Sequence, residues 1–128
     1  MKDDDFLLIG NKLTHPDPKK MVDYYNQTKL IDNLLIKTLE RLGLSRDLLQ
    51  YGARFRGNRV EMFYSLKEDA IIGSNGKRIE LKEGDKIIVT ISYKYTKDSL
   101  MEVLKMYFDD VELHTSKDEI FALALCKK

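Results

Sequence analysis

The residues best suited to chemistry lie where a predicted strand meets a helix, in the stretch TISYKYT at residues 90–96. Hydroxyl groups at a strand end can line a pocket and orient a small polar molecule. Thr90 and Ser92 are two residues apart, which predicts one shared strand face, opposite the apolar residues at 87, 89 and 91. Met62, on another predicted strand, would be an adaptable pocket wall. The competing interpretation is a sheet with one solvated face.

Motifs for other chemistries are incomplete in this sequence. It contains no GxSxG, HExxH, Walker or GxGxxG pattern. Its two histidines, His15 and His114, and its single cysteine, Cys126, are too few for a four-ligand zinc site. We therefore predict neither a catalytic side chain nor a metal ligand.

Composition limits the class of protein. The 128 residues suffice for one domain, and 22 Lys and Arg against 21 Asp and Glu give a net charge of +1. This balance argues against a nucleic-acid partner, which would need a basic face. No apolar run approaches the roughly 18 residues of a membrane span, and the acidic start MKDDDFLLIG does not resemble a signal peptide. The sequence predicts a cytoplasmic protein without a membrane partner.

The first third of the sequence predicts a strand and then helices. DFLLIG at residues 5–10 has four consecutive apolar residues, which is typical of a strand buried on both faces in a parallel sheet. Asp17 suits a helix N-cap and Pro18 the first helical position. The helical spacing that follows predicts either one helix of about 25 residues or two that break near residues 26–27, ending at Gly43.

The remainder predicts strands, a helix and a closing hairpin. Alternating residues between 52 and 93 predict an antiparallel meander of about four strands, with a hairpin turn at Asn75 and Gly76. Thr96 suits the N-cap of the next helix. Two strands over residues 110–127 complete a single-domain α+β fold.

Three segments resemble a known family in their residues, order and spacing. They are NRVEMFYS (58–65), ISYKYT (91–96) and FLLIGNKLTHPDPKKMVDYYN (6–26). The first two are similar to the R-I-E-M strand and the N-S-x-K-Y-T motif of the SAM-dependent histidine-specific methyltransferases, typified by the enzyme that trimethylates histidine in ergothioneine biosynthesis. The third is similar to a strand, loop and helix of the same family.

The resemblance implies that the sequence corresponds to the C-terminal part of such an enzyme. Residues 1–10 and 93–128 would be a partial Rossmann-like methyltransferase sheet, with its last helix and closing hairpin. Residues 11–92 would be the inserted substrate-binding region, made of helices and the meander. The half that holds SAM in the family has no counterpart here. SAM is therefore not expected to bind this chain alone, and the chain alone is expected to be inactive.

The resemblance also implies four substrate-binding residues: Tyr25, Met62, Thr90 and Ser92. Ser92 falls on a serine that reads the imidazole of the substrate, and Thr90 falls on the glutamate that also reads it. A neutral hydroxyl in place of a carboxylate loses a charge-assisted hydrogen bond. The expected substrate is thus an amine or amino-acid-like small molecule rather than histidine.

Three functions remain open at this point. The first is the substrate-binding portion of a SAM-dependent N-methyltransferase, completed by a chain that carries the SAM-binding half. The second is a non-catalytic binding or assembly module derived from such an enzyme, and the third is a small enzyme of another class. If the strand at residues 5–10 lacks its usual neighbour, its unpaired edge would favour a homodimer.

Overall fold

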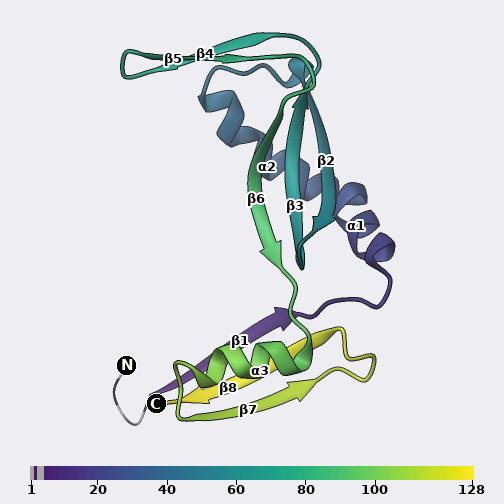
Figure 1. The fold of residues 1–128 in the computed structure, drawn as a ribbon, viewed down its shortest axis with the longest axis vertical. Coiled ribbons are helices and arrows are strands. Elements are labelled where there is room, and N and C mark those ends of the chain that lie inside the picture. Colours follow the sequence, from purple (N-terminus) through teal and green to yellow (C-terminus); the bar gives the residue numbers. More distant parts are fainter. Residues whose placement is uncertain (1, 3–4) are drawn as a thin grey trace. The chain divides into compact units, whose positions relative to one another are not determined.

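The computed structural model describes residue 2 and residues 5–128, without the side chain of residue 74 (Figure 1). Residues 1, 3 and 4 of the predicted N-terminal segment lie outside this part. In chain order the elements are β1 (Phe6–Lys12), α1 (Pro18–Gln27), α2 (Lys29–Arg41), the 3-10 helix η1 (Arg46–Leu48), β2 (Leu49–Arg56), β3 (Arg59–Leu66), β4 (Ala70–Ser74), β5 (Lys77–Leu81), β6 (Lys86–Tyr93), α3 (Lys97–Lys105), β7 (Asp110–Thr115) and β8 (Phe121–Lys127).

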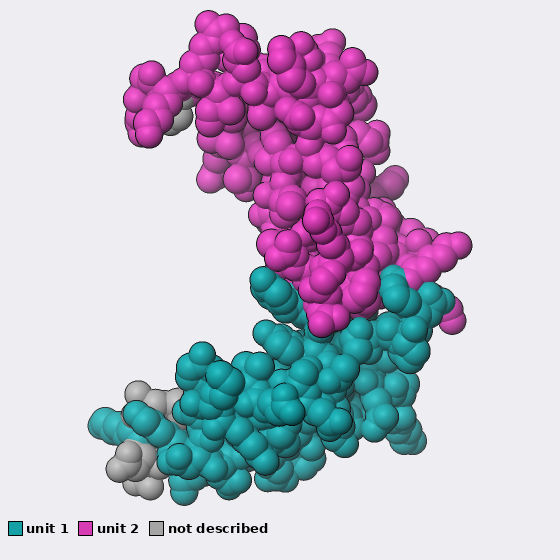
Figure 2. Space-filling view, viewed as in Figure 1, with its two compact units in different colours: residues 1–18, 93–128 teal, residues 19–92 magenta. Residues whose placement is uncertain are grey.

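The chain divides into two compact units (Figure 2). One unit is the continuous segment Lys19–Ser92, and the other combines the residues through Pro18 with Tyr93–Lys128. The α+β class is confirmed, because each unit combines helix with antiparallel sheet.

The discontinuous unit contains a three-stranded sheet in the order β1-β8-β7, with α3 packed on one face. The predicted cap is present, since Thr96 and Ser99 form a reciprocal capping box at the start of α3. The buried cluster beneath the helix consists of Leu13, Leu100, Leu104, Ala122, Ala124 and Cys126.

Strand β1 differs from its prediction. It pairs antiparallel with β8 and forms an edge of this sheet, whereas the sequence suggested a parallel strand buried on both faces. The side chains of Phe6 and Leu8 are 61% and 60% exposed. The reason is that the cluster under α3 is centred on β8, and no described element covers the other face of β1.

Two helices open the continuous unit, which settles the alternative left open by the sequence. The break lies at Thr28, between α1 and α2. Gly43 ends α2 with a φ of +91°. The N–H of Gly43 donates to the carbonyl of Glu40, and the N–H of Leu44 donates to that of Leu39. This pair of bonds is a Schellman motif, which needs a left-handed residue at the position of Gly43.

The predicted meander is wrong in its pairing. The order of the main sheet is β2-β3-β6, while β4 and β5 form a separate two-stranded sheet. The N–H of Leu66 donates to the carbonyl of Asp85 at 3.0 Å, and the N–H of Gly84 donates to the carbonyl of Leu66 at 2.9 Å. These bonds bring the start of β6 to the end of β3, so the intervening hairpin is excluded from the main sheet.

The central strand β3 buries all of its helix-facing side chains and, on the opposite face, the side chain of Glu61. Its helix-facing side chains pack under α1 and α2 and are all buried, as their alternation predicted: Val60, Met62, Tyr64 and Leu66. On the opposite face the carboxylate of Glu61 is also fully buried. Arg54 Nε donates to it at 2.7 Å, and Arg59 donates through Nε at 2.9 Å and through a terminal nitrogen at 2.6 Å.

These charge-assisted bonds, the one from Arg54 above all, hold the pKa of Glu61 below its usual value. A carboxyl whose pKa is lowered by folding stabilises the native state above its unfolded pKa, near 4.3. That contribution is lost as the pH falls through the lower pKa of the folded state.

We therefore expect Glu61→Gln to lower the urea midpoint at about pH 7 and to reduce the loss of stability between about pH 5 and pH 2. Urea unfolding across this pH range, followed by circular dichroism, measures both effects. Glu68→Gln is the matched control, because Glu68 is exposed and lies outside the buried ion cluster. Equal midpoints for Glu61→Gln and the unsubstituted protein at neutral pH would contradict this role.

Candidate functional site

Three of the four predicted site residues come together inside the continuous unit. Tyr25, on α1, is only 8% exposed and shares a buried cluster with Met62 of β3. Its hydroxyl donates to the hydroxyl of Ser92 on β6 at 3.4 Å. Residues 67 positions apart in the sequence are thus in contact.

Strand β6 presents Ser92 to α1 because its alternation changes phase. Ile87 and Val89 pack in the apolar cluster beneath α2, and Ile88 is exposed. Val89 and Thr90 are then both half-buried, after which Ile91 is exposed and Ser92 is half-buried. Two consecutive half-buried residues followed by inverted alternation mark a change of phase within the strand.

This change of phase corrects the predicted faces of β6. The sequence placed Thr90 and Ser92 opposite the apolar residues at 87, 89 and 91, which is wrong for the first two of these. The burial pattern instead groups Thr90 and Ser92 with Ile87 and Val89 on the inner side of the strand. Thr90 is also half-buried, and it lies two residues before Ser92, so both side chains are on the same side of the strand.

Two side chains that sequence reasoning missed position Tyr25. The hydroxyl of Tyr51 on β2 donates to the backbone carbonyl of Tyr25 at 3.2 Å. The side-chain oxygen of Asn26 accepts from the N–H of Ala53 at 2.8 Å. Burial raises the pKa of Tyr51, so its hydroxyl stays protonated and can donate at neutral pH. In the sequence, only the possible helix break near residues 26–27 pointed to this region.

A third tyrosine fixes the second helix on the same sheet. Tyr64 Oη donates to Asp32 Oδ1 at 2.6 Å and contacts the backbone carbonyl of Asp32 at 2.9 Å. Burial raises the pKa of Tyr64 as well, with the Asp32 carboxylate as a further cause. Arg46 pairs with the other carboxylate oxygen of Asp32 at 3.1 Å. The start of α2 is therefore tied to β3 by polar as well as apolar contacts.

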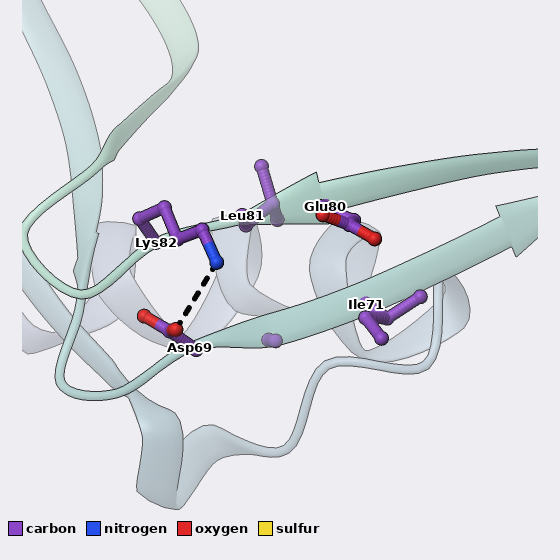
Figure 3. Close-up of a pocket in the computed structure, with 6 residues that line it drawn as sticks. Asp69, Ile71, Glu80, Leu81 and Lys82 are labelled. Atoms are coloured by element: carbon purple, nitrogen blue, oxygen red, sulfur yellow. Dashed lines mark hydrogen bonds and ion pairs between the residues drawn. The ribbon is translucent and has the colours of Figure 1, made fainter.

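The cavities described in the structure lie elsewhere, along the β4–β5 hairpin. One of about 300 Å³ is bounded by Asp69, Ile71, Glu80, Leu81 and Lys82 (Figure 3). Asp69 accepts from Lys82 Nζ at 3.3 Å and from the N–H of Glu83 at 2.8 Å, so its carboxylate already serves to close the base of the hairpin. None of the four predicted site residues lines the three cavities along this hairpin.

The residues present do not fit the cofactor that the resemblance implies. A SAM or dinucleotide cradle needs glycine where a strand leads into a helix, so that backbone can approach the ligand. The connections from β1 to α1 and from β6 to α3 contain none of the seven glycines. Gly10 lies within β1, and a side chain there would meet the ring of Phe121 at 3.2 Å.

Residue 2 and residues 5–128 contain no group of three or more His, Cys, Asp or Glu side chains that could hold a metal ion. The helices in this range, of which α2 is the longest, are too short or too polar to cross a membrane.

Comparison with known proteins agrees with the motifs at 58–65 and 91–96. No curated protein matches the sequence. A family model described as histidine-specific methyltransferase, SAM-dependent, matches residues 1–128, the whole sequence. The chain therefore belongs to the family of SAM-dependent, histidine-specific methyltransferases.

Proposed function

We propose that this chain supplies the methyl-acceptor site of a SAM-dependent N-methyltransferase, and that the acceptor is a small amine or amino-acid-like molecule. The observation that carries the proposal is the contact between Tyr25 and Ser92, with Met62 in the same cluster as Tyr25. The family match supports a small-molecule methyltransferase. The distance between the two hydroxyls supports their use in binding.

That distance, 3.4 Å, is long for a bond between two hydroxyl groups, whose usual separation is about 2.7–2.8 Å. A long bond costs little to exchange for a contact with a ligand. Tyr25 and Ser92 can each both donate and accept. The pair therefore suits a ligand nitrogen that needs either a donor or an acceptor.

The chemistry of the site favours an uncharged nitrogen. Thr90, Ser92 and Tyr25 offer neutral hydroxyls, and the buried carboxylate of Glu61 lies on the opposite face of β3, committed to two arginines. A neutral amine is also the form that can accept a methyl group. In this proposal the side chains hold and orient the acceptor, which is the main contribution required when the donor is already activated. None of them acts as a nucleophile.

A methionine-methyl experiment tests the site directly. With ¹³C-methyl methionine labelling, a panel of small amines and amino acids is titrated into the protein while the Met62 signal is followed by NMR. We expect one class of amine to shift Met62. We expect Tyr25→Phe and Ser92→Ala to weaken that binding by roughly two- to tenfold, since each removes one neutral hydrogen bond.

Two comparisons make the experiment decisive. Met106, which is 71% exposed after α3, is the internal control and should not shift. Thr90→Glu should move the preference toward cationic amines, because it introduces a carboxylate. If every ligand that binds leaves Met62 unmoved, or if Tyr25→Phe and Ser92→Ala bind as well as the unsubstituted chain, the proposed acceptor site is wrong.

We further propose that the SAM-binding half lies outside these 128 residues, in the same polypeptide or in another, and pairs with β1. The first half of β1 supports this placement, because Phe6, Leu7 and Leu8 are all exposed although they are large and apolar. The opposite edge strand, β7, exposes polar side chains such as Glu112 and His114 instead. On this proposal β1, α3, β7 and β8 are part of a Rossmann-like sheet that continues beyond β1.

Calorimetric titration tests this second part of the proposal. The chain alone is expected to show no tight binding of SAM, and adding the SAM-binding half of a related enzyme is expected to restore it. Leu8→Lys should weaken the restored binding at least tenfold, since it places a charge where apolar surface must be buried. Leu34→Lys, at a leucine of α2 that is 71% exposed, is the matched control.

The result also separates the enzyme from its alternative. Methyl transfer to the amine identified by NMR, in the reconstituted mixture, would establish the enzymatic function. Binding of the amine without any transfer would favour a non-catalytic binding module. Tight SAM binding by the chain alone would contradict the division into two halves.

A further inference from the structure

The hairpin of β4 and β5 is a two-stranded ribbon that extends away from β2, β3 and β6 (Figure 1). Its turn has two residues, Asn75 and Gly76, with φ of 51° and 74°, which are the positive values of a type I′ turn. In β5 the four residues from 77 to 80 are all exposed. An isolated two-stranded ribbon is marginally stable in water, so a partner strand would stabilise it.

One face of this ribbon exposes apolar surface. Ile72 of β4 lies directly opposite Ile79 of β5, and both line a cavity of about 380 Å³ together with Leu42. Ile72 packs partly against the core beneath α2, whereas Ile79 remains 52% exposed. The apolar row thus ends at the free edge of β5.

The turn determines which backbone groups point to that edge. In a two-residue hairpin the residues that flank the turn exchange both of their hydrogen bonds, and such pairs then alternate along the strands. Counting from the Ser74–Lys77 pair, Ile79 is bonded to Ile72 within the hairpin. Arg78 and Glu80 therefore direct their N–H and C=O groups outward, to the free edge.

The order of side chains on β5 makes this edge complementary to itself. In an antiparallel pair centred on Ile79, Arg78 lies opposite the partner's Glu80, and Glu80 lies opposite the partner's Arg78. The outward backbone groups of Arg78 and Glu80 are those that such a pair uses. We propose that β5 pairs antiparallel with β5 of a second copy of this chain, forming a four-stranded sheet in the order β4-β5-β5-β4.

This arrangement satisfies groups that are weakly partnered in a single copy. Within one chain Arg78 and Glu80 approach only to 3.7 Å, and their side chains are 67% and 61% exposed. Opposite charges directly across a strand pair stabilise it, and a two-fold axis creates the contact twice. The two Ile79 side chains meet at the axis and extend the apolar row from Ile72 to the partner's Ile72.

Charges on an edge strand usually discourage pairing. On β5, Arg78 and Glu80 share a face, carry opposite charges and flank Ile79. These charges favour the antiparallel register centred on Ile79. They oppose a parallel pair, in which Arg78 would face the partner's Arg78. The edge of β1 carries no comparable pattern, because its exposed residues Phe6, Leu7 and Leu8 are uncharged.

Charge reversal tests the register. Sedimentation equilibrium of the full chain over a concentration series should show a dimer. Arg78→Glu and Glu80→Arg should each raise the dimer dissociation constant on the order of tenfold or more, because each replaces two attractive pairs by two repulsive ones. The double variant Arg78→Glu/Glu80→Arg should restore the original constant. Circular dichroism confirms that each variant is folded.

Disulfide trapping provides a second readout. In the proposed pair the Cα atoms at position 79 are about 4.5 Å apart, within reach of a disulfide. Ile79→Cys with diamide, which accepts the two electrons and two protons of the thiols, should therefore give a covalent dimer. Lys77→Cys is the control, since its thiols would be separated by more than about 13 Å. The native Cys126 is fully buried.

The results of these experiments decide whether β5 forms the dimer interface. A chain that stays monomeric at high concentration overturns the proposal, as does a double variant that associates no better than the single ones. A dimer that is broken by Leu8→Lys and unaffected by the charge reversals would assign the interface to β1 instead. Because the acceptor-site experiment does not involve β5, failure here leaves the proposed function to its own test.

Discussion

The continuous unit depends on what β3 buries on each of its two faces. One face presents an apolar row that α1 and α2 must cover, and the other carries a carboxylate that two arginines must neutralise. Apolar contacts alone would leave the helices free to slide along this surface. The hydroxyls of Tyr51 and Tyr64 restrict that freedom, because each reaches a single backbone carbonyl, on α1 and on α2 respectively.

The R-V-E-M segment thereby links stability to the candidate site. Arg59 and Glu61 form part of the buried ion cluster, while Met62 points to the helices and packs with Tyr25. A buried ion pair stabilises a fold less than its geometry suggests, but it fixes position strongly, since either partner alone would be an unpaired charge. Side chains alternate between the two faces of a strand. Glu61, which fixes the position of β3, is therefore next to Met62, which faces the candidate site.

The sequence predicted local features well and pairing poorly. The cap at Thr96, the Schellman glycine at position 43 and the turn at Asn75 each depend on a few neighbouring residues. The return of β6 to β3 depends on contacts across nearly twenty residues, and the phase change at Thr90 depends on that return. Likewise, the contact of Tyr25 with Ser92 could be predicted only from the family resemblance, because no sequence periodicity relates residues so far apart. The exposure of the first half of β1 reflects its place at the edge of its sheet, which a strand's own sequence does not encode.

The phase change in β6 has a consequence for how the protein can diverge. It divides the strand into a half that supports the core, through Ile87 and Val89, and a half that faces the candidate site, through Thr90 and Ser92. Substitutions in the second half leave the apolar cluster under α2 intact. If the proposed function holds, substitutions at positions 90 and 92 can therefore change acceptor preference at little cost in folding stability.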